Sequence, residues 1–209
     1  MTIPRIRWLA TGIVLLAAFL VLGLLVDRTP LALDQAVVDA LRGQDSQPAG
    51  QVAGVVTNVL GPVLPIVVGV ALVAVVLRNR AHLPLCLKLA AVLVLCRLTS
   101  VVFKPVFLRQ RPREYPDLSY PSGHVVSVAS AALVVVLLAA WLAPRLARKA
   151  AVVGAVITVL AAACRVVLGV HWVTDTVGAV LAVLGVGLVS ASALRLLPVS
   201  GRDGRSLDG

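Results

Sequence analysis

Long apolar stretches alternate with short polar segments along most of the chain. Six of these stretches are long enough to cross a bilayer as an α-helix, which takes about 20 residues. They lie at residues 8–26, 52–77, 83–103, 124–143, 150–168 and 173–195. The pattern predicts an all-α, polytopic membrane protein with six transmembrane helices in a bundle.

The first apolar stretch follows Arg5 and Arg7, an arrangement that a secretory signal peptide also shows. A signal peptide has a shorter apolar core, of about 7–15 residues, and a cleavage site made of small residues. Because no A-x-A site precedes Asp27, we expect an uncleaved first helix.

Residues 33–43, between the first two spans, carry a helical pattern of another kind. Val37, Ala40 and Leu41 recur at helical spacing, and Asp34 is a possible N-cap. The pattern favours a short amphipathic helix on the outer membrane surface. An ordered polar loop is the alternative.

Composition supports a membrane protein and excludes several other classes. Of the 209 residues, 60% are hydrophobic, more than a soluble domain of this length can bury. We expect a single transmembrane domain at 1–199 and a disordered cytoplasmic tail at 200–209, which is rich in Gly, Ser and Asp. The net charge of +10 does not indicate a nucleic-acid partner, because many of the basic residues lie in short loops. No obligate protein partner is indicated.

The cysteines give no sign of a metal site or a disulfide framework. No CxxC pair occurs, and each cysteine lies inside an apolar run, where a small buried hydrophobe is expected. The cysteines are Cys86, Cys96 and Cys164.

Basic residues predict the orientation of the spans. Four basic groups fall on one side of a six-helix arrangement, and the positive-inside rule makes that side cytoplasmic. Both termini are then cytoplasmic as well. The groups are Arg5 and Arg7; Arg78 and Arg80; Arg145, Arg148 and Lys149; and Arg195, Arg202 and Arg205.

Three polar segments gather on the opposite side of the predicted bundle. They read KPVFLRQRP at 104–112, PSGH at 121–124 and RVVLGVHWVTD at 165–175. Ionisable groups in or beside a bilayer are costly, so they indicate function by default. A solvated basic loop is the plainer alternative for the basic residues of the first segment.

Three cations in these segments predict an anion site. Lys104, Arg111 and Arg165 would repel one another unless an anion lay between them, and arginine offers phosphate a bidentate fork. Ser122 and Gly123 open the fourth span, where free backbone N–H groups point at an anion. Together these residues predict a phosphate-binding pocket.

The two histidines of these segments have different surroundings. His171 stands four residues before Asp175, on the same helical face, so the carboxylate can fix its tautomer and leave the other ring nitrogen free to attack phosphorus. His124 has no carboxylate at that spacing and lies beside the anion site, where it can protonate a leaving oxygen. A zinc site formed by His124, His171 and Asp175 is the rival, disfavoured because the neighbouring cations would repel a metal.

Four further cations lie outside this pattern. Arg109 and Arg113 flank the pocket, and contact with lipid headgroups is their suggested role. Lys88 and Arg97 lie within the third span, where each either faces the bundle or extends to the membrane surface. We assign no role to these two.

The order of the motifs resembles the type 2 phosphatidic acid phosphatase family. Lys104, Arg111 and Pro112 match its first motif, residues 121–124 its second, and Arg165, His171 and Asp175 its third. The family usually has serine before the third-motif arginine, whereas this chain has Cys164, a weaker donor.

The resemblance implies a membrane phosphatase that works through a phosphohistidine. His171 is then the nucleophile, Asp175 supports it and His124 is the general acid. The phosphoryl oxygens are held by Lys104, Arg111, Ser122, Gly123 and Arg165. No cofactor or metal is expected, because the fixed cations offset the developing charge.

The expected substrate is a membrane lipid with an exposed phosphate or diphosphate. The composition looks bacterial, and in that setting the resemblance favours a polyprenyl diphosphate such as undecaprenyl diphosphate. Phosphatidylglycerophosphate and phosphatidate are alternatives. A lipid phosphotransferase and a non-enzymatic lipid carrier remain as other classes, although a carrier would not need the His171–Asp175 pair.

Overall fold

The computed structural model describes residues 3–27 and 29–197, so the expected tail at 200–209 lies outside the described residues. Within these residues, six long helices are apolar enough to cross a membrane, and their ends differ from the predicted spans by up to six residues in either direction. They are α1 (Ile3–Val26), α3 (Pro48–Arg78), α4 (Leu83–Phe107), α5 (Gly123–Leu142), α6 (Pro144–Val167) and α7 (Val173–Ala193). The all-α membrane bundle is thus confirmed.

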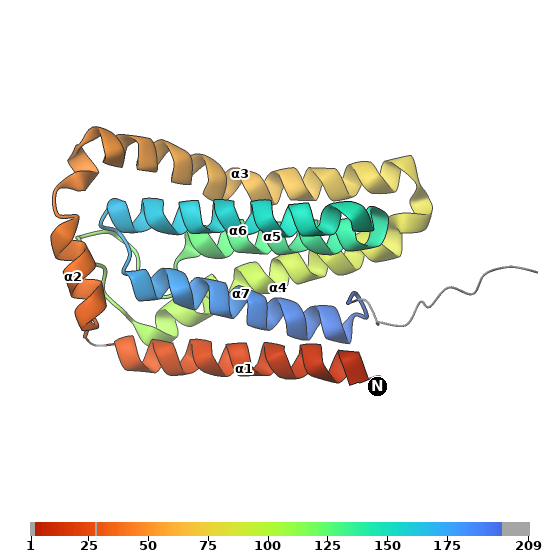
Figure 1. Ribbon diagram of the computed structural model, residues 1–209, viewed down its shortest axis with the longest axis horizontal. Helices are drawn as coiled ribbons and strands as arrows, with labels where there is room; N and C mark the ends of the chain where they lie inside the picture. Colours follow the sequence, from red (N-terminus) through yellow and green to blue (C-terminus); the bar gives the residue numbers. More distant parts are fainter. Residues whose placement is uncertain (1–2, 28, 198–209) are drawn as a thin grey trace, which may run out of the picture.

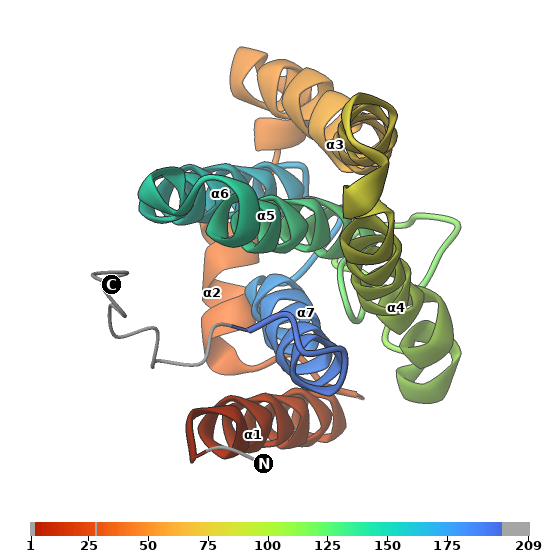
Figure 2. The same ribbon diagram turned by 90° about the vertical axis from the view of Figure 1, so that its right-hand side faces the viewer.

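The long helices lie roughly side by side in an elongated bundle (Figure 1). Seen along the helices, α7 lies between α1 and α5, α6 lies beside α5, and α3 and α4 flank α5 on its other sides (Figure 2). Glycines let α7 approach its neighbours closely. A Cβ on Gly185 would lie 2.7 Å from Leu16 of α1, and one on Gly178 would collide with the ring of Tyr120.

The connections alternate between the two ends of the bundle. Those that join α3 to α4 and α5 to α6 lie at the same end as the start of α1 (Figure 1). The basic groups lie at or next to these connections: Arg78 ends α3 and Arg80 follows it, whereas Arg145, Arg148 and Lys149 lie in the first two turns of α6. The long segment 108–122 and the turn 168–172 lie at the other end. All three polar motifs are therefore brought to one end of the bundle.

A short helix, α2 (Ala32–Ala40), crosses that end between α1 and α3 (Figure 1). The prediction of a helix here is confirmed, but the expected cap is wrong. Leu31 occupies the N-cap position, and Asp34 lies within the first turn with its side chain completely buried. This carboxylate instead bonds to the start of α7, because Thr174 donates its backbone N–H to Asp34 Oδ1 over 3.0 Å.

Aromatic rings fasten the long segment 108–122 to the bundle. Tyr120 is fully buried, stacks on Phe19 of α1 with 5.3 Å between ring centroids, and meets Phe107 edge to face. Its hydroxyl donates to the Phe19 carbonyl over 2.6 Å. Burying the ring and pairing its hydroxyl fixes the backbone next to the PSGH motif.

Candidate active site

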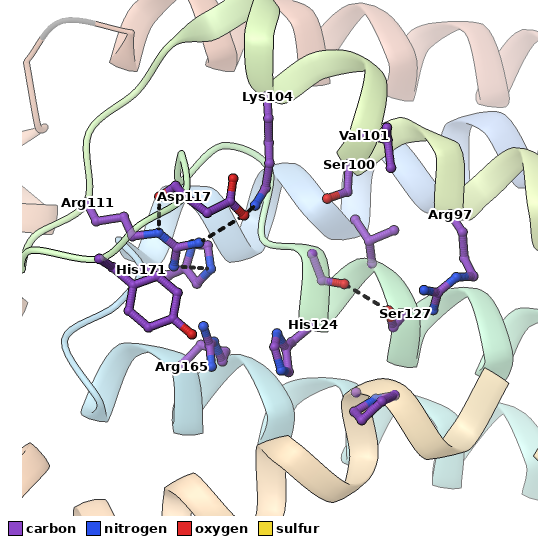
Figure 3. Close-up of a pocket in the computed structure, with 15 residues that line it drawn as sticks. Arg97, Ser100, Val101, Lys104, Arg111, Asp117, His124, Ser127, Arg165 and His171 are labelled. Atoms are coloured by element: carbon purple, nitrogen blue, oxygen red, sulfur yellow. Dashed lines mark hydrogen bonds and ion pairs between the residues drawn. The ribbon is translucent and has the colours of Figure 1, made fainter. Parts of the chain in front are cut away.

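A cleft of about 380 Å³ opens between α3, α4, α5, the end of α6, the segment 108–122 and the turn 168–172. Six residues of the predicted site line it, one or more from each polar motif: Lys104, Arg111, Gly123, His124, Arg165 and His171. Figure 3 shows the side chains of the five that it labels pointing toward one another. The three motifs lie up to about 70 residues apart in the sequence. The structure brings them together because the helices that carry them end side by side at one end of the bundle.

His171 and Asp175 form the predicted pair, but they do not share a helical face, because His171 lies in the turn before α7 and Asp175 in its first turn. His171 Nδ1 lies 3.2 Å from Asp175 Oδ2, and the same carboxylate oxygen accepts the backbone N–H of Trp172 over 2.9 Å. The Asp175 contact assigns the proton to Nδ1 and leaves the lone pair on Nε2. Burial lowers the pKa of His171 to about 4, against the opposing effect of Asp175. The imidazole is therefore neutral at pH 7.

Arg109 holds the other oxygen of Asp175. Its Nη1 donates to Asp175 Oδ1 over 2.6 Å, and its Nη2 donates to Asp34 Oδ2 over 2.8 Å. The Arg109 side chain is only 3% exposed. The suggested lipid-headgroup role is therefore wrong for Arg109, because its guanidinium is buried and paired with the carboxylates of Asp34 and Asp175. Arg113, by contrast, is exposed and pairs with Asp45.

Arg111 lies against the free side of the His171 ring. Its Nη1 is 3.0 Å from His171 Nε2 and 2.7 Å from the carbonyl oxygen of Val170. Its Nη2 donates to the Leu118 carbonyl over 3.2 Å. These backbone contacts hold the guanidinium in one place beside His171 Nε2, where it lines the cleft.

Asp117 neutralises part of the cationic cluster. Its carboxylate contacts Lys104 and lies 3.5 Å from Arg111 Nη2. Burial, the largest single influence, would raise the pKa of Asp117, but the hydrogen bond and charge of Lys104, the Leu118 N–H and the charge of Arg111 together hold this pKa below its usual value. The contacts show that these two cations can share a carboxylate, and an anionic ligand can compete for the same donors.

Ser122, Gly123 and Arg165 lie where α5 begins and α6 ends. Ser122 takes the N-cap position of α5, but its side chain makes no capping bond. Among the described residues, Ser122 Oγ and Arg165 Nε are buried side-chain atoms without a hydrogen-bond partner. Such orphaned groups are costly, and together with the free N–H groups at the start of a helix they suit an anion with several oxygens.

His124 follows directly in the first turn of α5 and lies across the cleft from His171 (Figure 3). Gly61 of α3 faces its ring so closely that a Cβ there would overlap His124 Cδ2. Among the described residues, no hydrogen bond fixes the His124 ring. Packing against α3 therefore sets its position.

Several lining residues were not identified from the sequence. Tyr115 lies under Arg111, with 4.4 Å from the guanidinium carbon to the ring centroid, and Asp117 pairs with Lys104. Arg97 also lines the cleft and donates to Ser127 Oγ over 2.7 Å. The only feature of the sequence that pointed to Arg97 was its charge within a predicted span. No feature of the sequence pointed to Tyr115.

Two further features of the described residues concern metal ligands and the cysteine before Arg165. In the part of the chain that is described, no three His, Cys, Asp or Glu side chains gather as metal ligands. Cys164, which replaces the usual serine, is buried and is not among the residues that line the cleft.

Comparisons with known proteins agree with this geometry. None of the curated proteins matches the chain significantly. The fold is similar to that in the crystal structure of a transmembrane PAP2-type phosphatidylglycerolphosphate phosphatase from Bacillus subtilis. The TM-score is 0.70 and the identity 23%, over 86% of this chain and 94% of that one. The family model of the PAP2 superfamily matches residues 82–196, more than half of the chain and all three polar motifs. The chain therefore belongs to the PAP2 superfamily and is a multi-pass membrane phosphatase.

Proposed function

We propose that the protein removes the terminal phosphate of a membrane lipid through a phosphohistidine on His171. The observation that carries this proposal is the arrangement around His171. The Asp175 carboxylate accepts a hydrogen bond from His171 Nδ1, and His171 Nε2 faces a cleft lined by Lys104, Arg111 and Arg165. A neutral, oriented imidazole beside a cluster of fixed cations is suited to attack on phosphorus.

In the first step, His171 Nε2 forms a bond to phosphorus while the bond to the leaving oxygen breaks. His124, across the cleft, gives its proton to that oxygen. The cations and the start of α5 hold the other phosphoryl oxygens, for which Arg111 exchanges its contact with His171. Asp175 stabilises the charge on the phosphorylated ring.

In the second step, water attacks the phosphohistidine, and His124 accepts a proton from that water. The P–N bond breaks, its electron pair returns to Nε2, and inorganic phosphate leaves. The balance requires no metal, because fixed cations supply the positive charge. We therefore propose that phosphate release persists in EDTA.

The lipid tail would remain in the bilayer while the headgroup enters the cleft. Apolar side chains cover the outer faces of α3 and α4 next to the cleft, including the exposed Val59, Val63, Leu98 and Val101. Such surfaces are compatible with acyl or prenyl chains. We propose undecaprenyl diphosphate as the substrate. Phosphatidylglycerophosphate, the lipid after which the similar Bacillus subtilis phosphatase is named, is the main alternative.

Phosphate release from a panel of pure lipids tests this proposal. The purified full-length protein in detergent would be given undecaprenyl diphosphate, phosphatidylglycerophosphate and phosphatidate, each with and without EDTA. We expect the highest kcat/KM on undecaprenyl diphosphate, and no effect of chelation on phosphatidylglycerophosphate or phosphatidate, whose terminal phosphates are monoesters. Release from none of them would refute the function. Loss in EDTA, restored by one metal, would refute the histidine mechanism.

A further inference from the structure

One cation in the cleft lies far from the cluster around His171. Arg97 precedes Lys104 by seven residues on α4, which places it about two turns, or roughly 10 Å, deeper along the helix axis. It lies near the middle of the span Leu83–Phe107 and lines the cleft together with Ser100 and Val101. A cation at this depth is costly unless it faces a polar cavity and has a task there.

The contacts of Arg97 leave much of its hydrogen-bonding capacity unused. Its Nη1 donates to Ser127 Oγ, and that hydroxyl donates to the Gly123 carbonyl over 3.0 Å. Within the described part of the chain, Arg97 forms no ion pair, whereas Lys104 and Arg111 both contact Asp117. A guanidinium offers five N–H donors, so Arg97 can still bind an anion in the cleft.

Arg97 lies on the side of His124 that faces away from the His171 cluster. Ser127 follows His124 by about one helical turn on α5, and Figure 3 shows His124 between the Arg165–His171 group and the Arg97–Ser127 pair. In an in-line displacement, the attacking and leaving atoms lie on opposite sides of phosphorus. A leaving group that departs past His124 therefore extends toward Ser127 and Arg97.

We propose that Arg97 and Ser127 form a subsite for a second phosphate, carried by the leaving group. This inference rests on the proposed function and narrows its substrate class. When the bond between the two phosphates of a diphosphate breaks, its electron pair stays on the lipid phosphate. Arg97 offsets that charge, and His124 supplies the proton. A lipid whose leaving group is a neutral alcohol gains nothing from Arg97.

A matched pair of substrates tests the subsite. Farnesyl diphosphate and farnesyl monophosphate share one tail and differ in the second phosphate. For the purified full-length protein, we expect R97M to lower the ratio of kcat/KM (diphosphate over monophosphate) about tenfold, because a hydrogen bond to a charged group is lost. R97K should keep most of the preference. The control is K88M, which removes another cation of α4 that does not line the cleft, and should leave the ratio unchanged.

S127A provides a second variant, should R97M fail to fold. It removes the hydroxyl that positions the guanidinium, so a smaller fall in the same ratio is expected. The same ratio is measured for a second pair, phosphatidylglycerophosphate over phosphatidate. In this pair the second phosphate is linked through glycerol, whereas in farnesyl diphosphate it is linked directly. A loss of preference within either pair supports the subsite.

A ratio that stays within about twofold of wild type in both R97M and S127A, for both substrate pairs, would overturn the subsite. A wild-type enzyme that shows no preference for the second phosphate in either substrate pair would also overturn it, while the phosphatase function would stand. If the wild type releases phosphate from none of these lipids, the proposed function itself fails.

Discussion

At the scale of single residues, the site depends on how Asp175 is held. One of its oxygens faces His171, and the other faces Arg109, which also binds Asp34. Local spacing predicts the first contact, although in the structure His171 lies in the turn just before α7 and not within the helix. It cannot predict the second, because Asp34 and Arg109 lie far from Asp175 in sequence and no periodicity links them. The pairing arises only when α2 packs across the start of α7.

Arg109 is therefore expected to position the catalytic pair without touching the substrate. R109K keeps the charge but loses the planar fork that reaches both carboxylates. We expect kcat to fall on the order of tenfold to hundredfold, with KM nearly unchanged, because a small misplacement of Asp175 and His171 is costly. R113K, at an exposed ion pair, is the control. A change confined to KM would instead indicate contact with the lipid headgroup.

The protonation of His171 gives a second prediction at this scale. Burial lowers the pKa of His171 from 6.5 to about 4, so the neutral, nucleophilic form is present above that pH and is lost as the pH falls through it. Nitrogen NMR of histidine-labelled protein in detergent can follow the ring, with His171→Ala to identify its signals. We expect Nε2 to remain unprotonated at pH 5. A midpoint near 6.5 would contradict the buried setting.

At the scale of elements, the apolar pattern predicts all six spans and α2, and the structure shifts only their ends. This succeeds because hydrophobic length is a local property. How neighbouring helices shape the site is less visible in the sequence. Gly61 and Pro62 of α3 line the cleft, although in the sequence a Gly-Pro pair within a span indicates only a bend in the helix. Tyr115 and Asp117 reach it because of the path of segment 108–122, which no periodicity encodes.

The close approach of α3 to α5 is testable through Gly61. A methyl group there would overlap the His124 ring, so G61A must displace the proposed general acid. We expect kcat to fall about a hundredfold, the size typical of losing general acid catalysis. G54A and G69A lie on the same helix, where an added Cβ meets no atom within 4 Å. They should retain activity. Equal activity in all three variants would show that His124 is not held by this contact.

At the scale of the whole molecule, the fold separates two ends with different tasks. One end carries the basic connections, and the other carries the three motifs and α2 (Figure 1). The positive-inside rule places the basic end in the cytoplasm. We therefore propose that both termini are cytoplasmic and that the cleft opens at the outer face, where the headgroups of outer-leaflet lipids can reach it.

Cysteine labelling in intact cells tests this orientation. Asp117 lies beside the cleft and Arg148 near the opposite end of the bundle. In a background without Cys86, Cys96 and Cys164, we expect a cysteine next to Asp117 to react with an impermeant reagent. One at Arg148 should react only after the membrane is permeabilised. The reverse pattern would place the cleft in the cytoplasm and favour inner-leaflet substrates.

The central claim, that His171 attacks phosphorus, is tested most directly by trapping the phosphoenzyme. The purified protein would be mixed with lipid labelled in the terminal phosphate, quenched in alkali within one turnover and digested for mass spectrometry. We predict label on the peptide that contains His171, stable in alkali and lost in acid, as a phosphohistidine requires. H171A should carry no label and release no phosphate, whereas D175N should still form some phosphoenzyme. Label on another residue, or full turnover by H171A, would contradict the account.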